Sequence, residues 1–164
     1  MPTEIERKFV VVSEDWRAHM VRSVRYRQGY LANNARCSVR VRVAGKDARL
    51  NIKSAGLNVR RAEYEYRIPP EEADEMLDAL CEHPLIEKVR HDVRWMGWNW
   101  EVDVFEGENA GLVVAEIELE AEDQAFPLPP WVGPEVSHDA RYYNVNLVTH
   151  PYSRWGTESA SAEN

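Results

Sequence analysis

Cysteine is scarce in this chain: Cys37 and Cys81 are the only two among 164 residues, and they lie far apart. A disulfide scaffold is therefore not expected, a cysteine-ligated metal site is nearly excluded, and a reducing, cytoplasmic location is predicted. The sequence also lacks an apolar run of roughly 18 residues, so no transmembrane helix is expected. Its first residues, MPTEIERKF, are charged from Glu4 onward and are not typical of a secretory signal.

Several common motifs are missing as well. No P-loop or GxGxxG stretch occurs, which excludes a nucleotide held by a glycine-rich loop, and there is no GxSxG. No two histidines have the spacing of zinc ligands, so the five histidines are expected to be surface or core residues. Positive charge is in deficit, since 20 Lys and Arg face 28 Asp and Glu for a net charge of −8. That balance argues against nucleic acid or an anionic membrane as a partner.

Length and composition indicate one globular domain. Apolar residues make up 44% and charged residues 29%, which is too hydrophobic for a disordered chain. The length leaves no room for a second core of normal size. We place the domain at residues 1–155 and expect the small, polar residues 156–164 to form a disordered tail.

Apolar and charged residues alternate with a period of two along most of the chain, which predicts strands. Eight strands are expected, near residues 4–12, 24–31, 36–44, 48–54, 60–68, 86–95, 98–106 and 112–122. Helices are expected only near residues 13–20, 70–80 and 138–148. Many short strands with few helices predict a β-dominated α+β fold, either a barrel or a sandwich with a few peripheral helices.

One face of nearly every predicted strand is charged, and charges of the same sign are grouped on it. Such groups are Glu4 with Glu6, Arg40 with Arg42, Lys88 with Arg90, and Glu116 with Glu118 and Glu120. An antiparallel sheet with one solvated face gives the same alternation, which is the simpler interpretation of any single strand. A surface adapted only to solubility, however, would mix the two signs. The grouping favours a sheet that closes with its apolar face outward and its charged face around a lumen.

A lumen that holds acidic and basic strips is costly by itself, because like charges are crowded there with little screening. A ligand system that carries both signs removes this cost. Arginine and lysine bind the oxygens of a polyphosphate, and carboxylates bind Mg²⁺ or Mn²⁺. The charge pattern therefore predicts a site for a polyphosphate bridged to carboxylates by divalent cations.

The stretch EIERK at residues 4–8 resembles the ExExK motif on the first strand of the CYTH superfamily, the triphosphate tunnel metalloenzymes. The resemblance covers roughly residues 1–150 in the family's order. It includes RQGYL (27–31), SVRVR (38–42), NIKS (51–54), EYEY (63–66), KVR (88–90), WEVDVF (100–105) and AEIELE (115–120). It implies an eight-stranded antiparallel closed β-barrel, or tunnel, with the charged side chains inside.

By position in these motifs, the resemblance implies a role for each of several residues. The expected metal ligands are Glu4, Glu6, Asp103, Glu116 and Glu118. The expected substrate-binding residues are Lys8, Arg40, Arg42, Lys53, Lys88, Arg90 and Arg141, the last in a stretch that resembles the helix closing one tunnel mouth. The expected catalytic residues are Lys8, Glu63 and Glu65, the glutamates holding basic residues or orienting water. Tyr30 is a further candidate for the lumen.

The resemblance implies a metal-dependent hydrolase of small triphosphates, with inorganic tripolyphosphate as the favoured substrate and Mg²⁺ or Mn²⁺ as cofactor. Alternatives are a class IV adenylate cyclase, a thiamine triphosphatase and a non-catalytic polyphosphate-binding module. Family cyclases often carry a His-Phe pair upstream of ExExK, and only three residues precede Glu4, which weighs against a cyclase. The expected partner is the small-molecule substrate, without nucleic acid or membrane, in a monomer or homodimer.

Overall fold

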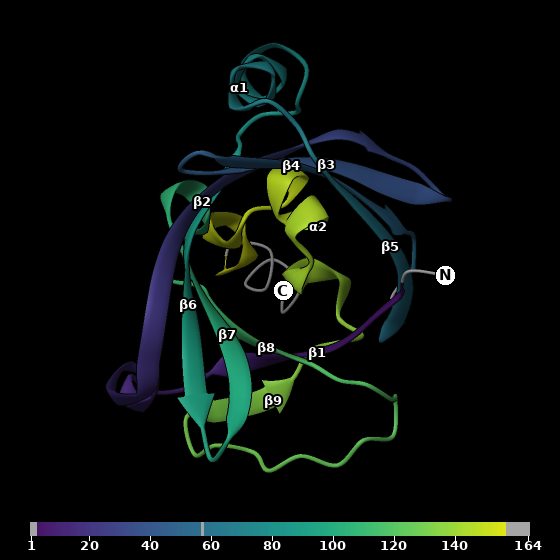
Figure 1. Cartoon of the computed structure of the whole chain (residues 1–164). Coiled ribbons are helices and arrows are strands. Elements are labelled where there is room, and N and C mark those ends of the chain that lie inside the picture. The colour runs from purple at the N-terminus through teal and green to yellow at the C-terminus, as the bar shows by residue number, and fades with distance from the viewer. Residues whose placement is uncertain (1–2, 57, 157–164) are drawn as a thin grey trace, which may run out of the picture.

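The computed structural model describes residues 3–56 and 58–156 and shows a ring of strands with helical segments around and within it (Figure 1). The strands are β1 (Thr3–Val11), β2 (Met20–Asn33), β3 (Cys37–Ala44), β4 (Asp47–Ser54), β5 (Arg60–Arg67), β6 (Ile86–Trp95), β7 (Trp98–Phe105), β8 (Val113–Glu118) and β9 (Val132–Glu135). The predicted tail, apart from Gly156, lies outside the described residues.

The helices of the described residues are short. They are α1 (Pro70–Ala79), α2 (Asn144–Thr149) and the 3-10 helices η1 (Asp15–His19), η2 (Gly107–Asn109), η3 (Ala140–Tyr142) and η4 (Tyr152–Arg154). Pro70 opens α1, with Glu71 and Glu72 in its first turn, as the sequence predicted. Across this part of the chain, no helix is both long and apolar enough to cross a membrane.

All eight predicted strands are present, most of them within two residues of their expected limits. The ninth, β9, has no counterpart in the sequence prediction. It is only four residues long and contains Gly133 and Pro134, two residue types that are rare in strands. Because β9 lies at the end of the sheet order, the missing N–H of Pro134 is tolerated there.

Eight of the strands close into a ring. Neighbours are antiparallel in the order β1–β5–β4–β3–β2–β6–β7–β8, and β8 pairs again with β1. The closure depends on β1, whose residues 3–5 pair with β5 while residues 6–10 pair with β8. The added strand β9 pairs with Phe9 and Val11 near the end of β1. The structure thus confirms the closed eight-stranded antiparallel barrel.

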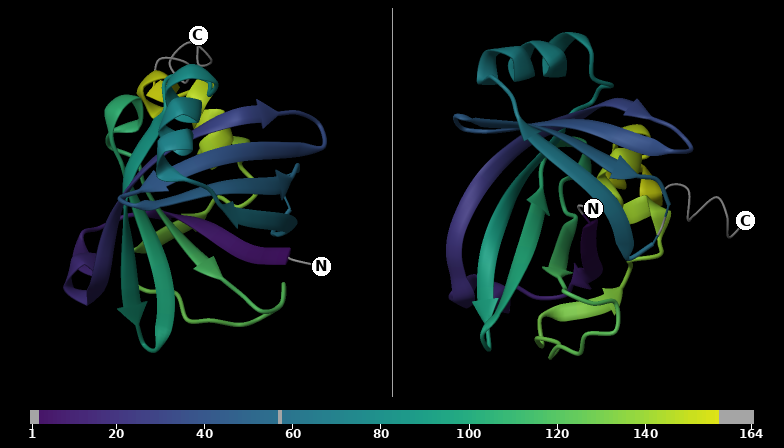
Figure 2. Two further views of the ribbon diagram at one scale, coloured as in Figure 1. Left: turned by 45° about the horizontal axis from the view of Figure 1, so that its top comes forward. Right: turned by 45° about the vertical axis from the view of Figure 1, so that its right-hand side comes forward.

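The apolar faces of the strands point outward and are covered by other segments. Phe9 and Trp100 from the barrel pack with Trp16 and Trp131 in one buried cluster, in which the two rings of Trp100 and Trp131 meet edge to face at 5.6 Å. A second outer cluster lies under α1, which packs on β3 and β4 (Figure 2). With the apolar core outside the wall, the charged faces of the strands are left to line the interior.

The helix α2 differs from the expected peripheral arrangement. It lies within the ring of strands when the barrel is viewed from one end (Figure 1). Its residues Leu147 and Val148 are buried in a cluster with Tyr30, Ile86 and Val114 from the barrel wall. This apolar plug closes one end of the bore.

The packing of α1 gives a first stability test. Leu77 is fully buried against the barrel, whereas Leu80, just after the helix, is 66% exposed. Leu77→Ala is expected to lower the free energy of unfolding by about 2–5 kcal/mol, through lost burial and the cavity left behind. Leu80→Ala is the matched control, with an expected change below about 0.5 kcal/mol. Urea unfolding followed by circular dichroism measures both, and equal effects would contradict the packing of α1 on the barrel.

Candidate functional site

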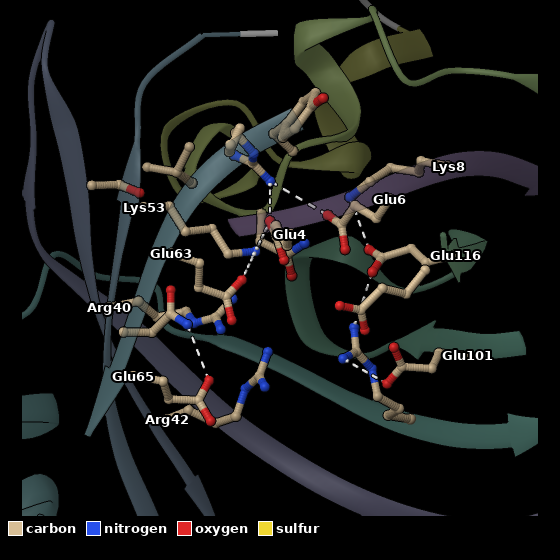
Figure 3. Close-up of a pocket in the computed structure, with 18 of the residues that line it drawn as sticks. Glu4, Glu6, Lys8, Arg40, Arg42, Lys53, Glu63, Glu65, Glu101 and Glu116 are labelled. Carbon is tan, nitrogen blue, oxygen red and sulfur yellow. Dashed lines mark hydrogen bonds and ion pairs between the residues drawn. The ribbon is translucent and has the colours of Figure 1, made fainter. Parts of the chain in front are cut away.

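The barrel encloses a polar cavity of about 200 Å³. Inward-facing strand residues form its wall, and Tyr143, Asn144 and Val145 at the start of α2 also line it. Every predicted site residue except Asp103 and Arg141 lines this cavity. Figure 3 shows labelled side chains from β1, β3, β4, β5, β7 and β8 converging on one space. The charged strand faces therefore surround a lumen, and the alternative of a solvated outer face is wrong.

The closed ring places acids and bases both side by side and across the bore. Lys8 on β1 is directly opposite Glu116 on the neighbouring strand β8. Strand β3 lies four strands away from β8 in either direction around the ring. Because side chains alternate along a strand, Arg40 and Arg42 of β3 both point inward, toward the wall that carries Glu116.

The acidic group of the cavity consists of Glu4, Glu6, Glu101, Glu116 and Glu118. Lys53 Nζ lies 2.8 Å from Glu4 Oε1, and Lys8 Nζ lies 3.0 Å from Glu116 Oε1. Arg61 Nη2 bridges two of the acids, at 3.2 Å from Glu4 Oε1 and 3.4 Å from Glu6 Oε1. Acid and base thus alternate within ion-pair distance around this part of the wall.

Burial and mutual repulsion set the protonation of the acidic group. Burial raises the pKa of Glu4, Glu6 and Glu118 above the usual value, and neighbouring carboxylates raise it further. Burial also raises the pKa of Glu101 to about 7, although Arg90 opposes the shift. Glu116 is the exception: burial would raise its pKa, but Lys8 and then Arg90 hold it well below the usual value. Apart from Glu116, these acids therefore keep their protons to a higher pH than free glutamate does, because the wall compensates their negative charge only in part.

The opposite wall carries uncompensated positive charge. Arg40 is buried, and its guanidinium has no hydrogen bond or ion pair with any described residue. Arg42 donates from Nε to Gln28 Oε1 at 3.0 Å and stacks over the ring of Tyr26 at 4.4 Å, but no carboxylate pairs with it in the described chain. Burial, together with Arg40 and Arg90, lowers the pKa of Arg42 to about 10. Two neighbouring cations, one buried and one half-buried, that have no carboxylate partner form a strong site for an anion.

Asp103 does not line the cavity, and its carboxylate is fully engaged by bases. Arg90 donates from Nε to Oδ1 at 2.7 Å and from Nη2 to Oδ2 at 2.8 Å, and Lys88 Nζ donates to Oδ2 at 2.8 Å. Burial alone would raise the pKa of Asp103, but Arg90 and Lys88 hold it far below the usual value. The carboxylate of Asp103, which the resemblance implies as a metal ligand, is thus occupied by Arg90 and Lys88 in this structure.

Arg141 also lies away from the cavity. It belongs to η3, where its Nη2 pairs with Asp139 Oδ2 at 2.9 Å and its guanidinium lies over the ring of Trp155 at 4.9 Å. Its side chain is 46% exposed. The structure therefore brings Tyr143 and Asn144 to the cavity in place of the predicted Arg141.

Other cavity residues were absent from the predicted site. Arg61 and Glu101 share the charged strand faces with predicted residues, so the period-two pattern contained the signal for both. Asn51, whose Nδ2 donates to Glu65 Oε2 at 3.1 Å, is uncharged and escapes a search based on charge. Tyr143 and Asn144 come from a segment outside the strands, where no alternation indicates which side chain faces inward.

Comparisons with known proteins agree with this geometry. The family model described as "CYTH domain" matches residues 2–152. The chain is 47% identical over 155 residues to an inorganic triphosphatase of Acetivibrio thermocellus, covering 94% of this chain and 99% of that protein. It is 40% identical over 151 residues to an inorganic triphosphatase of Nitrosomonas europaea, covering 89% of this chain and 97% of that protein.

A solved structure shares the fold as well. The crystal structure of an inorganic triphosphatase superposes with a TM-score of 0.64 at 34% identity, covering 90% of this chain and 95% of that chain. The likeness extends over nearly the whole barrel.

Proposed function

Because the chain belongs to the CYTH domain family, we propose that it is a metal-dependent triphosphatase whose substrate is inorganic tripolyphosphate. The relatives named as inorganic triphosphatases match nearly the full length of this chain, which supports the same activity here. The polar cavity, which is lined by both acidic and basic side chains, supports a substrate that carries several phosphates and binds with a cation.

The observation that carries this proposal is the pair of guanidinium groups of the buried Arg40 and the half-buried Arg42, neither of which has a carboxylate partner among the described residues. A folded protein seldom buries charge without a partner, because desolvation costs several kcal/mol per ion. A chain of phosphates supplies that partner, since arginine binds phosphate oxygens in a two-point fashion. Lys53, Lys88 and Arg90 line the same cavity and extend the basic surface along its length.

The size of the cavity supports an inorganic rather than an organic triphosphate. Its volume of about 200 Å³ is smaller than the roughly 300–1,000 Å³ of pockets that hold drug-sized ligands. Tyr143 and Val145 take up part of the lining and leave a small space between the charged side chains. A nucleoside or thiamine group would need room beyond this space, whereas a bare triphosphate does not.

The acidic group fits a divalent cation by its chemistry, since Mg²⁺ and Mn²⁺ prefer carboxylate oxygens. Glu4, Glu6, Glu116 and Glu118 are the proposed ligands. No three His, Cys, Asp or Glu side chains of residues 3–56 and 58–156 are grouped to enclose a cation, because lysine and arginine pair with these acids. We propose that phosphate oxygens draw the bases away from the acids, and that a bound cation neutralises charge on the phosphates.

Hydrolysis then follows the usual course of phosphoryl transfer, in which positioning and charge stabilisation supply most of the rate. The oxygen of a water molecule bonds to the terminal phosphorus as the bridging P–O bond breaks, and orthophosphate and pyrophosphate leave. The basic residues of the wall hold the phosphate oxygens, and Lys8 donates to them from beside Glu116. A carboxylate of the acidic group takes the proton of the water. Glu63 and Glu65 hold Lys53 and Asn51 in place.

A panel of substrates tests the proposed function. Purified protein is incubated with Mg²⁺ or Mn²⁺ and with tripolyphosphate, ATP or thiamine triphosphate. We expect orthophosphate release from tripolyphosphate at a kcat/KM well above that for the organic triphosphates. Cyclic AMP from ATP would instead identify a cyclase, preferred hydrolysis of thiamine triphosphate would identify that activity, and tight binding without product would identify a binding module.

Metal affinity is expected to depend on pH, because protons compete with the cation for the acidic group. The pKa values of Glu4, Glu6 and Glu118 are raised, so these carboxyls retain protons at a pH where free glutamate does not. Mg²⁺ and Mn²⁺ should therefore bind more tightly at pH 8 than at pH 6, with release of protons on binding. Isothermal titration calorimetry in two buffers of different ionisation enthalpy measures the metal affinity and the number of protons released. Equal affinity at both pH values, without proton release, would contradict the assignment.

The cytoplasmic location, the single-domain limits at residues 1–155 and the monomeric or dimeric state stay predictions. The lack of nucleic-acid and membrane partners also stays a prediction.

A further inference from the structure

Two buried amide side chains connect the basic wall to α2. Gln28 on β2 is fully buried, and Asn144, the first residue of α2, is 9% exposed. Gln28 Nε2 donates to Asn144 Oδ1 at 3.0 Å, and Gln28 Oε1 accepts from Arg42 Nε at 3.0 Å. Lys88 Nζ also donates to Asn144 Oδ1 at 3.0 Å. The result is a continuous hydrogen-bonded chain from Arg42 through both amides to Lys88.

Arg42 and Lys88, at the two ends of this hydrogen-bonded chain, fix the orientation of each amide. A guanidinium N–H and an ammonium can only donate, so each must face an amide oxygen. Arg42 therefore requires Oε1 of Gln28 on its side, which turns the Gln28 NH₂ toward Asn144. Lys88 likewise requires Oδ1 of Asn144, which also accepts from Gln28. Neither amide can flip without placing donor against donor.

This orientation leaves one group of Asn144 for a ligand. A carbonyl oxygen has two lone pairs, and Oδ1 already accepts two hydrogen bonds. The Nδ2 group has no acceptor among the residues that the structure describes, and it is not among the fully buried atoms that lack a partner. Asn144 itself lines the cavity. The NH₂ is thus the part of the side chain that remains for a cavity ligand.

We propose that Asn144 is a substrate-binding residue whose side-chain NH₂ donates a hydrogen bond to a phosphate oxygen. The inference rests on the proposed function, because it takes a triphosphate as the occupant of the cavity. A phosphate chain presents only acceptors to such a donor, and the donor is already oriented by Gln28 and Lys88 before binding. The contact would also tie α2, which closes one end of the bore, to the bound substrate.

The test compares Asn144→Asp and Asn144→Ala with the unchanged protein. Asn144→Asp keeps an oxygen where Gln28 and Lys88 donate but replaces the NH₂ by an acceptor, so the docking of α2 survives. Asn144→Ala removes the NH₂ without adding charge. A hydrogen bond to a charged group corresponds to about ten- to hundredfold in affinity. In both variants we expect at least a tenfold rise in Kd for tripolyphosphate, measured by calorimetry in EDTA, and in KM, measured with Mg²⁺.

Asn146→Asp is the matched control, since it adds the same charge to α2 at a residue outside the cavity, and its Kd and KM should be unchanged. Thermal unfolding shows which variants are folded. A merely structural role of Asn144 predicts unchanged Kd and KM in a folded Asn144→Ala, and that result overturns the inference. Asn144→Asp also places a negative charge beside the triphosphate, so an unchanged Kd in that variant overturns the inference too, whereas a raised Kd supports it only together with a raised Kd in Asn144→Ala. Should Asn144→Ala not fold, Asn144→Ser takes its place, since it removes the NH₂ without adding charge and keeps an oxygen at this position. Failure of the unchanged protein to hydrolyse tripolyphosphate would count against the proposed function instead.

Discussion

Glu6→Gln is expected to lower metal-dependent kcat for tripolyphosphate by about 100-fold or more. The change removes one negative charge from the proposed metal ligands but keeps an oxygen that can accept from Arg61, which lies 3.4 Å from Glu6 Oε1. The loss should be in turnover and in metal affinity rather than in folding. Phosphate release at saturating Mg²⁺ and calorimetric titration of the metal measure the two effects.

The same variant has a distinctive effect on stability. Burial and Glu116 raise the pKa of Glu6 in the folded protein, so the ionised form of Glu6 destabilises the fold. Below the unfolded-state pKa both Glu6 and its replacement are neutral, and no difference is expected there. As the pH rises through the raised pKa, the unchanged protein loses stability relative to Glu6→Gln. Without metal, Glu6→Gln should therefore unfold at a higher temperature than the unchanged protein at pH 8, but not at pH 4.

Glu120→Gln is the matched control for Glu6→Gln. Glu120 is exposed just beyond the end of β8 and does not line the central cavity. The same neutral replacement there should leave kcat and metal affinity unchanged. Wild-type turnover in Glu6→Gln would remove Glu6 from the metal site.

Arg40→Ala is the second change with a large expected effect. It should lower kcat/KM for tripolyphosphate by about 100-fold or more, equivalent to roughly 2–4 kcal/mol. The reason is that the guanidinium of Arg40 has no protein partner, so the substrate is its expected partner and loses that contact in the variant. Without substrate the variant should be at least as stable as the unchanged protein, since repulsion between Arg40 and Arg42 disappears. Steady-state kinetics and thermal unfolding measure these opposite changes.

Two further variants give that experiment its controls. Arg40→Lys keeps the charge but loses the two-point geometry of the guanidinium, so an intermediate kcat/KM is expected. Arg36→Ala removes an exposed arginine just before β3 and should leave the kinetics unchanged. Kinetics of Arg40→Ala equal to those of the unchanged protein would show that Arg40 does not contact the substrate.

Much of the site could be predicted because alternation is a local property. In a strand, the backbone alone sends residues i and i+2 to the same side. Glu4 and Glu6, and likewise Arg40 and Arg42, therefore had to share a face wherever their strands were placed. Grouping of like charges then indicated that these faces enclose a space, and the cavity confirms it.

Other features depend on segments that are distant in the sequence. Asp103 shares its strand face with Glu101, yet only the pairing of β6 with β7 brings Arg90 and Lys88 onto its carboxylate. The sequence around Arg141 and Asn144 has no alternation that would show which of the two side chains faces the cavity. The docking of α2 decides that Asn144 reaches it and Arg141 does not.

The sequence by itself determined the eight strands of the barrel, which of their faces are charged and the ExExK motif on the first strand. Only the tertiary structure decided that the strands close into a ring, which acid pairs with which base, and that α2 brings Asn144 to the cavity. The physical reason is range: side-chain alternation follows from the geometry of one strand, whereas closure and register follow from hydrogen bonds and packing between strands far apart in the chain.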